Sequence, residues 1–306
     1  MCSPTGVTLL KETMRRILWR AYWRLSPAKP AASLPDVVPP LPRHEEIRRF
    51  ITSLDMPDDN ARRYLEIHLD RIAITLSLVP LPQRTGKVLE LGSYMHTPPT
   101  LRQIHGYTEV RGAYFGTLGK SELKQSSIGG KPVFECYVDL FNAEQDRYPY
   151  ADSTFDCVLA CEIFEHFLHD PMHMLAEANR VLDSGGHLIL TTPNAASATA
   201  VARTLDMSEN PQFYSKYPDP RRLYAASGVG HMREYTPKEL AQVLHAAGFE
   251  IEHLFTKVAR DYRSHEWVLN LLRDLGFSIH LRGEQMYCIA RKATAVQERY
   301  PGFLYE

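Results

Sequence analysis

Two carboxylates and an imidazole stand close together in the sequence, directly after the apolar run 155–161. Glu162, Glu165 and His166 fall at positions i, i+3 and i+4, so a helix beginning there would present all three on one face. A second imidazole, His231, follows in the segment GHMREYT. Two carboxylates suit a hard cation such as Mg²⁺, two imidazoles favour a softer cation, and an imidazole can also act as a general base. We therefore expect catalytic roles for His166 and His231, and a metal site would consist of Glu162, Glu165, His166 and His231. The simpler alternative is that the carboxylates only balance the positive end of a helix.

The elements that must position these side chains are short apolar runs that alternate with amphipathic stretches from Lys87 onward. Such alternation predicts an α/β fold with a mostly parallel sheet that helices cover on both faces. A polar turn around Gly283 precedes the last run, which is typical of a strand that enters through a hairpin and is therefore antiparallel. The seven predicted strands are 88–92, 109–115, 134–140, 155–161, 187–192, 249–255 and 285–291.

Residues at the ends of these runs could hold a ligand. In an open parallel sheet, ligands bind beyond the carboxyl ends of the strands, and the first strand-to-helix turn brings a glycine close to them. That turn is ELGSYMHTPPT, in which Glu90 and Gly92 form an acidic-x-Gly pattern and Pro98-Pro99 predicts a short helix. Asp139, at the end of the third run, could accept a hydrogen bond from an adenine amine. A buried strand, a turn and a solvated Asp would explain the same residues without a ligand.

The stretch 148–194, YPYADSTFDCVLACEIFEHFLHDPMHMLAEANRVLDSGGHLILTTPN, resembles class I, S-adenosylmethionine-dependent methyltransferases with a type 11 methyltransferase domain. Both residue types and spacing match, including the helix end that Gly185 and Gly186 would close with a positive-φ turn. The resemblance implies a Rossmann-like, doubly wound, seven-stranded sheet over residues 86–292, with S-adenosyl-L-methionine as cofactor. The cofactor-binding residues that it implies are Glu90, Gly92, Ser93, Tyr94, Asp139, Leu140, Cys161 and Glu162.

Two further segments, 90–116 and 230–249, look like a subgroup associated with bacterial polysaccharide and lipid-linked glycan synthesis. This implies O-methylation of a sugar or lipid-linked saccharide, with residues 195–235 as a lid over the acceptor. Aromatic faces stack on sugars and Arg binds carboxylate or phosphate, so the lid composition suits a glycan or other small-molecule acceptor that is anionic. The lid side chains concerned are Phe213, Tyr214, Lys216, Tyr217, Arg221, Arg222 and Tyr224.

Two other functions remain open. Tyr94 and His96 replace later glycines of the first turn, and residues 114–116 offer no acid for the ribose hydroxyls, which favours a catalytically inactive scaffold or binding module. The ExxEH spacing with the distant HxxEYT is similar to the magnesium site of small-RNA 2′-O-methyltransferases and ubiquinone-pathway O-methyltransferases, which suggests metal-dependent RNA ribose methylation. DNA is not an expected partner, because Ala160-Cys161-Glu162 lacks the Asn/Asp-Pro-Pro-aromatic sequence that grips a base amine.

The amino-terminal region differs from the rest. Residues 1–49 carry nine Lys/Arg against four Asp/Glu in a chain of formal net charge −1, and residues 7–25 form a basic amphipathic helix with Trp19, Tyr22 and Trp23 beside the apolar stripe. That helix is expected to contact either a membrane surface or protein. The expected divisions are the helix 1–25, a linker 26–42 with six prolines, a helical extension 43–85 and, after the main domain, a tail 293–306. In the extension we expect helices from Arg43 to Leu54 and from Asp58 or Asp59, either of which could cap the second helix.

The composition of the chain indicates the cellular compartment in which we expect it. It is 44% hydrophobic, as in an ordinary globular core, and no apolar run is long enough to cross a membrane. Five cysteines without a CxxC pair fit a reducing compartment. We expect a cytoplasmic protein, peripheral to the inner face of the membrane if the helix 7–25 binds lipid.

Overall fold

The structure is a computed structural model that describes residues 37–207, 230–258 and 265–305. The predicted helix 7–25 and all seven lid side chains named above lie outside the described residues. Among the helices that are described, none combines the length and apolar composition needed to cross a membrane.

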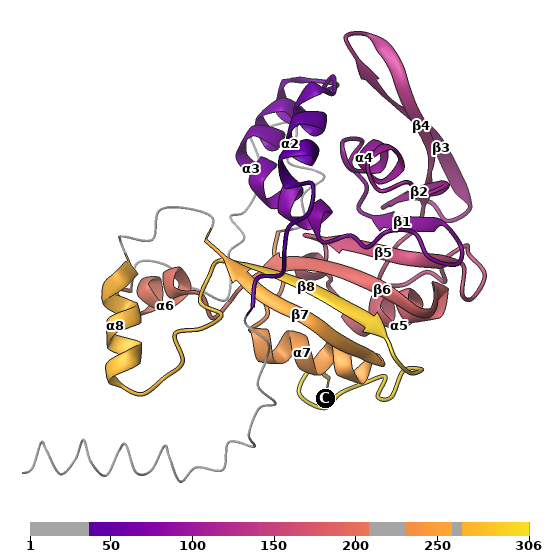
Figure 1. Cartoon of the computed structure of the whole chain (residues 1–306). Helices are drawn as coiled ribbons and strands as arrows, with labels where there is room; N and C mark the ends of the chain where they lie inside the picture. Colours follow the sequence, from indigo (N-terminus) through magenta and orange to yellow (C-terminus); the bar gives the residue numbers. More distant parts are fainter. Residues whose placement is uncertain (1–36, 208–229, 259–264, 306) are drawn as a thin grey trace, which may run out of the picture.

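Eight strands and seven α-helices are described (Figure 1). The strands are β1 Lys87–Leu91, β2 Glu109–Tyr114, β3 Lys120–Ile128, β4 Lys131–Leu140, β5 Phe155–Cys161, β6 Leu182–Pro193, β7 Phe249–Lys257 and β8 Gln285–Lys292. The helices are α2 His44–Ser53, α3 Asp59–Ser77, α4 Thr97–Gln103, α5 Pro171–Val181, α6 Ala198–Leu205, α7 Pro237–Ala246 and α8 Glu266–Asp274, and η1 Phe164–His166 is a 3₁₀ turn.

The strands form one sheet in the order β3-β4-β2-β1-β5-β6-β8-β7. The five strands from β4 to β6 in this order run parallel to one another, while β8 is antiparallel to β6 and β7. This confirms the predicted α/β fold, its seven strands and the antiparallel last strand. The chain adds an eighth strand, β3, which pairs antiparallel with β4 at the sheet edge and was not predicted.

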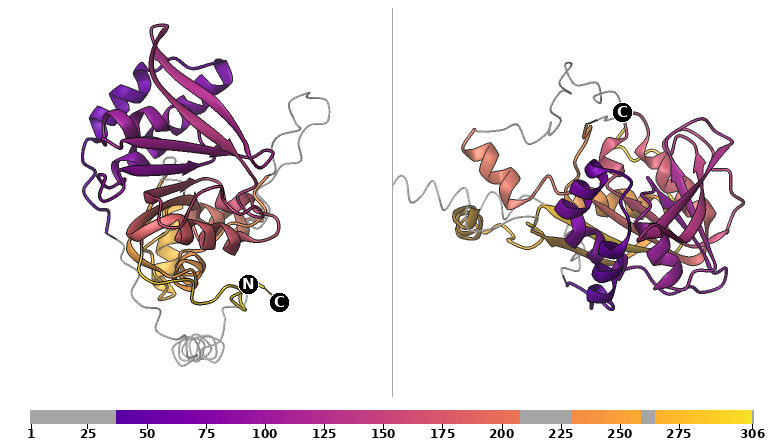
Figure 2. Two further views of the ribbon diagram at one scale, coloured as in Figure 1. Left: turned by 90° about the vertical axis from the view of Figure 1, so that its right-hand side faces the viewer. Right: turned by 90° about the horizontal axis from the view of Figure 1, so that it is seen from above.

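Helices cover both faces of the sheet (Figures 1 and 2). Because side chains alternate along a strand, Val88 of β1 shares a buried core with Ile51 of α2, while its neighbour Leu89 shares the opposite core with Leu175 of α5. The helices α2, α3 and α4 therefore cover one face, and α5 and α7 cover the other. The helices α6 and α8 contact each other beside the sheet.

The strand β3 was missed because most of its side chains are polar and its first six residues are exposed, so no apolar alternation marks it. The available signal was the two-residue turn Gly129-Gly130, where both residues have positive φ as a tight hairpin turn requires. The carboxylate of Asp55, between α2 and α3, accepts hydrogen bonds from both backbone N–H groups of this turn, at 3.0 and 2.8 Å. The hairpin is thereby attached to the helical extension.

The predicted helix starts in the extension are confirmed. Asp58 caps α3, because its carboxylate accepts a hydrogen bond from the N–H of Ala61 at 2.8 Å. The helix α4 after the first turn has seven residues, as the Pro98-Pro99 pair predicted.

Two predictions about the chain after β5 are wrong. No helix begins at Glu162, whose φ is 55°; a 3₁₀ turn follows, and α5 begins only at Pro171, capped by Asp170. Nor does Gly185 end that helix. The chain is already extended at Leu182, which pairs with Phe155 of β5, so the positive φ of Gly185 (74°) bends β6 instead.

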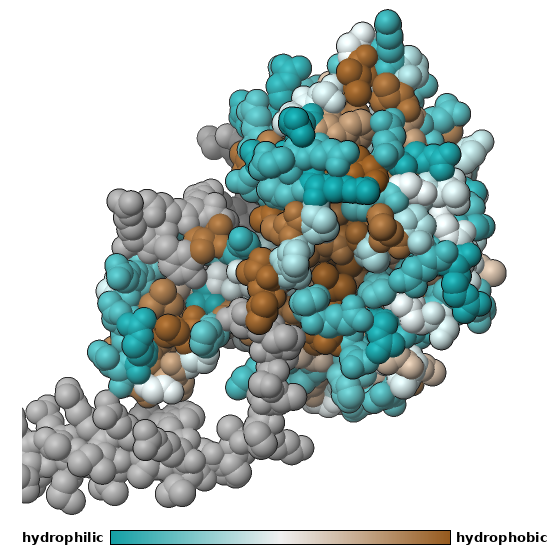
Figure 3. All heavy atoms as spheres, in the orientation of Figure 1, coloured by the Kyte–Doolittle hydropathy of each residue, from teal (hydrophilic) through white to brown (hydrophobic). Residues whose placement is uncertain are grey.

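Apolar atoms gather on the face seen in Figure 3, over β8 and the segment that leads into α2. A hollow of about 420 Å³ lies there, and no candidate site residue lines it. Its lining includes Pro39, Pro40, Leu81, His105 and Ile289.

The start of the sheet is held by one buried carboxylate. Asp156 of β5 accepts hydrogen bonds from the backbone N–H groups of residues 83, 84, 85 and 86, at 2.8 to 3.1 Å. Burial alone would raise the pKa of Asp156, but these hydrogen bonds to its ionised form outweigh burial and lower the pKa. The connection into β1 is therefore attached to β5 before the first strand pair begins.

We expect Asp156→Ala to lower the free energy of unfolding by about 2–4 kcal/mol at pH 7, because it leaves four backbone donors without their acceptor. Urea titration measures this, with the exposed Glu66→Gln on α3 as the control. Because the folded pKa is lowered, the contribution of Asp156 is present at neutral pH and is lost as the pH falls below 3.8 through the folded pKa. An equal loss at pH 7 and at strongly acidic pH would contradict this account.

Candidate active site

The candidate residues gather at the carboxyl ends of β1, β5 and β6. Gly92 follows β1 with a φ of 70°, and a Cβ there would lie 2.7 Å from a side-chain carbon of Ile163. Ser93 donates its backbone N–H to the carbonyl of Ala113 on β2 at 2.9 Å. The turn after β1 therefore lies tightly between β2 and the segment after β5, and only glycine fits at its first position.

Glu90 points into this turn and is almost completely buried. Its carboxyl accepts a hydrogen bond from the hydroxyl of Ser93 at 2.7 Å. Burial raises the pKa of Glu90 to about 8, against the opposing effect of hydrogen bonds from Ser93 and Thr97. In the absence of a cationic ligand group, Glu90 is therefore mostly protonated at neutral pH.

The helical extension reaches into the same region. Tyr64 of α3 stacks on Tyr94 of the β1 turn, with ring centroids 5.2 Å apart and planes 14° apart. Tyr94 in turn stacks on His96 at 5.8 Å. Burial, and then the nearby charge of Arg71, lower the pKa of His96 to about 4, so this imidazole is neutral. Tyr94 and His96, which replace later glycines of the first turn, thus form a contact surface for α3.

Arg71 of α3 lies beside Glu162 at the end of β5. One guanidinium nitrogen is 3.7 Å from the Glu162 carboxylate, and another donates to the hydroxyl of Tyr64 at 2.9 Å. The same Glu162 oxygen accepts hydrogen bonds from the hydroxyl of Thr191 at 2.8 Å and from the amide of Gln285 at 2.6 Å. Glu162 is therefore bound by three separate elements, α3, β6 and β8.

Asp139 ends β4 on the other side of β1. Its carboxylate accepts hydrogen bonds from the hydroxyls of Tyr150, at 2.8 Å, and of Ser121 on β3, and it lies 3.8 Å from a guanidinium nitrogen of Arg111. Leu140 is half-buried and limits the approach of the segment after β2, where a Cβ on Gly116 would meet it at 3.0 Å. The expected adenine end of the site is thus an ordered polar network.

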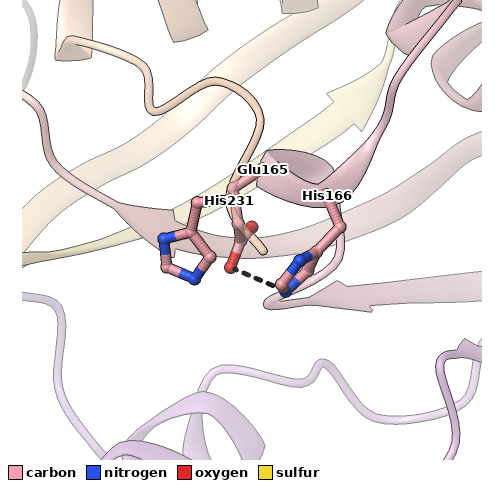
Figure 4. Close-up of side chains that lie close together, drawn as sticks. All are labelled: Glu165, His166 and His231. Carbon is pink, nitrogen blue, oxygen red and sulfur yellow. Dashed lines mark ion pairs between the residues drawn. The ribbon is translucent and has the colours of Figure 1, made fainter. Parts of the chain in front are cut away.

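Glu165, His166 and His231 form a compact cluster, in which one possible ligand atom of each lies within 4.8 Å of the others (Figure 4). Glu165 is fully buried, whereas the His side chains are 37% and 30% exposed, so the cluster opens on the imidazole side. The backbone N–H of Met232 donates to the carbonyl of Glu165 at 2.7 Å. This hydrogen bond holds the segment of His231 against the 3₁₀ turn.

The hydrogen bonds of the two imidazoles define their tautomers. Nδ1 of His166 lies 3.3 Å from the carbonyl oxygen of Gly230, which can only accept, so Nδ1 carries the proton. Nδ1 of His231 lies 2.8 Å from the buried carboxylate of Glu234, which we assign as the acceptor in the same way. In the neutral form, both Nε2 atoms then carry a lone pair that can take a proton or bind a metal.

Glu165 has one oxygen engaged and one unsatisfied. Oε2 accepts a hydrogen bond from the hydroxyl of Thr192 at 2.9 Å, while Oε1 is buried without a hydrogen-bond partner among the described residues and lies 4.0 Å from Nε2 of His166. Burial, and next the charge of Glu162, raise the pKa of Glu165 well above its usual value. A carboxyl in this setting is neutral unless a cation accompanies it.

The expected four-residue metal set becomes three in the structure, because Glu162 does not join it. The positive φ of Glu162 sends the chain away from a helical path, so positions i and i+3 do not share a face. Cys161, the other residue expected at this strand end, is half-buried beside Thr191. Burial raises the pKa of its thiol, so Cys161 is neutral at pH 7.

The sequence interpretation missed five residues of the site, and for three of them a signal existed. Tyr64, His68, whose ring centroid lies 4.5 Å from that of Tyr64, and Arg71 fall at i, i+4 and i+7 of a helix that ends just before the main domain, which predicts one shared face. Gln285 and Glu234 had no such signal, since each reaches the site only through the fold.

We expect Glu90 to make stability depend on pH. Between pH 4.5 and about 8, the folded state holds one more proton at Glu90 than the unfolded state, so stability falls as the pH rises, by up to about 1.4 kcal/mol per pH unit. Glu90→Gln removes this slope, because the amide does not titrate. Urea unfolding of both proteins from pH 5 to pH 8 measures the difference, and parallel pH profiles would show that Glu90 is not buried as a neutral acid.

Comparison with known proteins places this geometry in a family. A family model described as a methyltransferase domain matches residues 61–254, a range that begins inside α3. An uncharacterized 37.1 kDa protein in transposon TN4556 of Streptomyces fradiae is 30% identical over 128 residues, which cover 41% of this chain and 34% of that protein. This chain therefore spans about a third of the length of that relative.

Similar folds occur among solved structures at low identity. A chain from the complex between the Haloferax volcanii Trm112 methyltransferase activator and a methyltransferase has a TM-score of 0.48 and 13% identity, covering 81% of this chain and 98% of that one. A Thermotoga maritima S-adenosylmethionine-dependent methyltransferase, described as a possible histamine N-methyltransferase, has a TM-score of 0.45 and 16% identity, with 81% and 99% covered. With the family match extending over more than half of its length, the chain belongs to the family of proteins that carry this methyltransferase domain.

Proposed function

We propose that this protein transfers a methyl group from S-adenosylmethionine to a hydroxyl of a sugar or lipid-linked saccharide. The observation that carries the proposal is the pair of imidazoles, His166 and His231. The carbonyl of Gly230 and the carboxylate of Glu234 hold their Nδ1 atoms, so a neutral ring carries its lone pair on Nε2. A sulfonium methyl is already activated, so the protein must orient the acceptor, exclude water and remove a proton. An alcohol needs that base, whereas a neutral amine could react without one.

The reaction balances with these groups. The acceptor oxygen would form a bond to the methyl carbon while the bond between that carbon and sulfur breaks. The electron pair of the broken bond would stay on sulfur, which gives S-adenosylhomocysteine. The hydroxyl proton passes to Nε2 of His166 or His231. Glu234 stabilises the imidazolium that results at His231, because its carboxylate accepts the Nδ1 hydrogen bond at 2.8 Å.

For the cofactor, we assign the turn from Glu90 to Tyr94, Asp139-Leu140 and Cys161-Glu162, and we add Arg71. The amino-acid end of S-adenosylmethionine carries a carboxylate and an ammonium. Arg71 could bind that carboxylate and Glu162 could bind that ammonium. Both side chains are largely buried, and the 3.7 Å between the Arg71 guanidinium and the Glu162 carboxylate is longer than a hydrogen bond. Glu90 would ionise beside an added ammonium group.

We expect calorimetry to detect S-adenosylhomocysteine binding by the wild-type chain and at least about tenfold weaker binding by Arg71→Ala, since a buried charged hydrogen bond is lost. Arg63→Ala, on the exposed side of the same helix, is the matched control and should bind as the wild type does. Equal affinity of Arg71→Ala and the control would remove Arg71 from the site. No binding of either cofactor form at millimolar concentration would favour the inactive scaffold over the enzyme.

A second candidate adds a divalent cation to the cluster of Glu165, His166 and His231. The buried, unsatisfied Oε1 of Glu165 favours it, because a cation would keep this carboxylate ionised. The donor set of one carboxylate and two imidazoles suits Zn²⁺, Mn²⁺ or Fe²⁺ better than Mg²⁺, which prefers oxygen ligands. Such a cation would lower the pKa of an acceptor hydroxyl, and RNA ribose methylation would depend on it.

We expect His166→Ala and His231→Ala to lower turnover on a hydroxyl acceptor by about 10²- to 10⁴-fold while S-adenosylhomocysteine still binds. Turnover of the wild type with and without EDTA, together with the metal content of the purified protein, separates base from cation. Wild-type turnover that EDTA abolishes and Zn²⁺ or Mn²⁺ restores would establish the cation. Undiminished turnover of both His variants would contradict both candidates.

A further inference from the structure

Apart from the hydrogen bond of Ser121 to Asp139, the edge strand β3 makes no contact, in the described part of the chain, that the candidate site uses. In this sheet the connection from β2 to its parallel neighbour β4 contains no helix; the chain passes beyond β4, runs back as β3 and returns through the Gly129-Gly130 turn (Figure 1). The strand β3 is last in the sheet order, so its outer row of backbone N–H and C=O groups has no strand partner among the described residues. Such a row can pair with another strand.

The charges of β3 determine which strand would fit. Lys120, Glu122 and Lys124 alternate in sign along one face of the strand and are exposed. Charges on an edge normally discourage pairing, because a strand with other charges meets like charges in most alignments. An antiparallel copy of the same sequence is different, since one alignment places each Glu122 opposite Lys124 of the other copy.

That alignment is centred on Leu123. The regular part of the strand runs from Lys120 to the irregularity between Ser126 and Ser127, and Leu123 is its middle residue. Centring one residue earlier would oppose Glu122 to itself, and centring one residue later would oppose Lys124 to itself. Centring two residues earlier, on Ser121, would pair Glu122 with Lys120 but would leave the second half of the strand opposite residues that lie outside it. Centring on Leu123 therefore both joins opposite charges and pairs the whole regular strand.

An apolar contact lies at the same centre. Leu123 is 56% exposed, and its cross-strand neighbour Tyr137 on β4 is 51% exposed. Residues paired across strands share a face, so both lie on the face where no crossover helix covers β3 and β4. The guanidinium of Arg111 lies 5.4 Å from the Tyr137 ring centroid and bounds this apolar pair on the β2 side.

We propose that β3 pairs antiparallel with β3 of a second copy of this chain, about a two-fold axis at Leu123, to form one continuous sheet across a symmetric dimer. The contact is isologous: two Glu122–Lys124 pairs form on one face of the continuous sheet, and two Leu123 and two Tyr137 side chains lie on the other face. Within one chain, Lys124 Nζ lies 2.6 Å from the Glu122 carboxylate, so pairing exchanges this ion pair in each copy for two ion pairs between the copies.

Charge reversal tests this pairing in the full chain. Glu122→Lys makes both cross-pairs Lys–Lys and Lys124→Glu makes both Glu–Glu, so sedimentation velocity should show each single variant dimerising at least about tenfold more weakly than the wild type. The double variant E122K/K124E restores both pairs and should dimerise as the wild type does. An equimolar mixture of the two single variants should form heterodimers, since Lys then faces Glu at both positions.

Glu135→Lys, an exposed reversal on β4 outside the proposed contact, controls for net charge and should leave dimerisation unchanged. Circular dichroism confirms that every variant is folded. A wild-type chain that stays monomeric throughout the micromolar range would overturn the proposal. So would single variants that associate as strongly as the wild type, or a folded double variant that fails to recover association.

Discussion

Two carboxylates close to the end of one strand impose the constraint on which the site depends. Glu162 follows β5 directly and Glu165 lies three residues further on; burial, and next the charge of Glu162, raise the pKa of Glu165. A negative charge on the buried Glu165 is costly unless a cation accompanies it. The two carboxylates have different partners. Glu162 lies beside Arg71 and accepts hydrogen bonds from two neutral donors. Glu165 accepts one hydrogen bond from a hydroxyl, and its Oε1 has no hydrogen-bond partner among the described residues.

The position of the helical extension follows from that constraint. Arg71 belongs to α3, which precedes the first strand of the sheet, yet it supplies the positive charge beside Glu162. Around this contact the extension adds the Tyr64–Tyr94 stack and the hydrogen bonds of Asp55 to the β3–β4 turn. The first turn of the sheet lacks its later glycines for the same reason, because Tyr94 and His96 are contact residues for α3. The extension therefore contributes side chains to the candidate site.

The positive φ of Glu162 separates two groups of side chains, Glu162 with Arg71 and Glu165 with the two imidazoles. Its positive φ ends β5 abruptly and turns Glu162 toward Arg71, while the following 3₁₀ turn presents Glu165 and His166 to His231. A non-glycine residue in this conformation is strained, and three hydrogen-bonded or charged partners hold it there. Glu162 therefore lies with Arg71 on one side of the strand end, and Glu165 lies with the two imidazoles on the other.

How much of this the sequence determined depends on the range of the interactions. Hydrophobic alternation was sufficient to predict the α/β fold, seven of its strands and the antiparallel last strand, because burial patterns and turn residues are local signals. The residues from 148 to 194 were sufficient to predict the methyltransferase family. Asp58 as a cap and the short α4 were predictable for the same reason. The mostly polar strand β3 was not predictable in this way, since the Gly129-Gly130 turn is its only local signal. Its place in the fold also depends on the hydrogen bonds from that turn to Asp55, which is distant in the sequence. The separation of Glu162 from Glu165 was not predictable either: spacing assumes a helix, and only the tertiary contacts with Arg71, Thr191 and Gln285 stabilise the left-handed residue that breaks it.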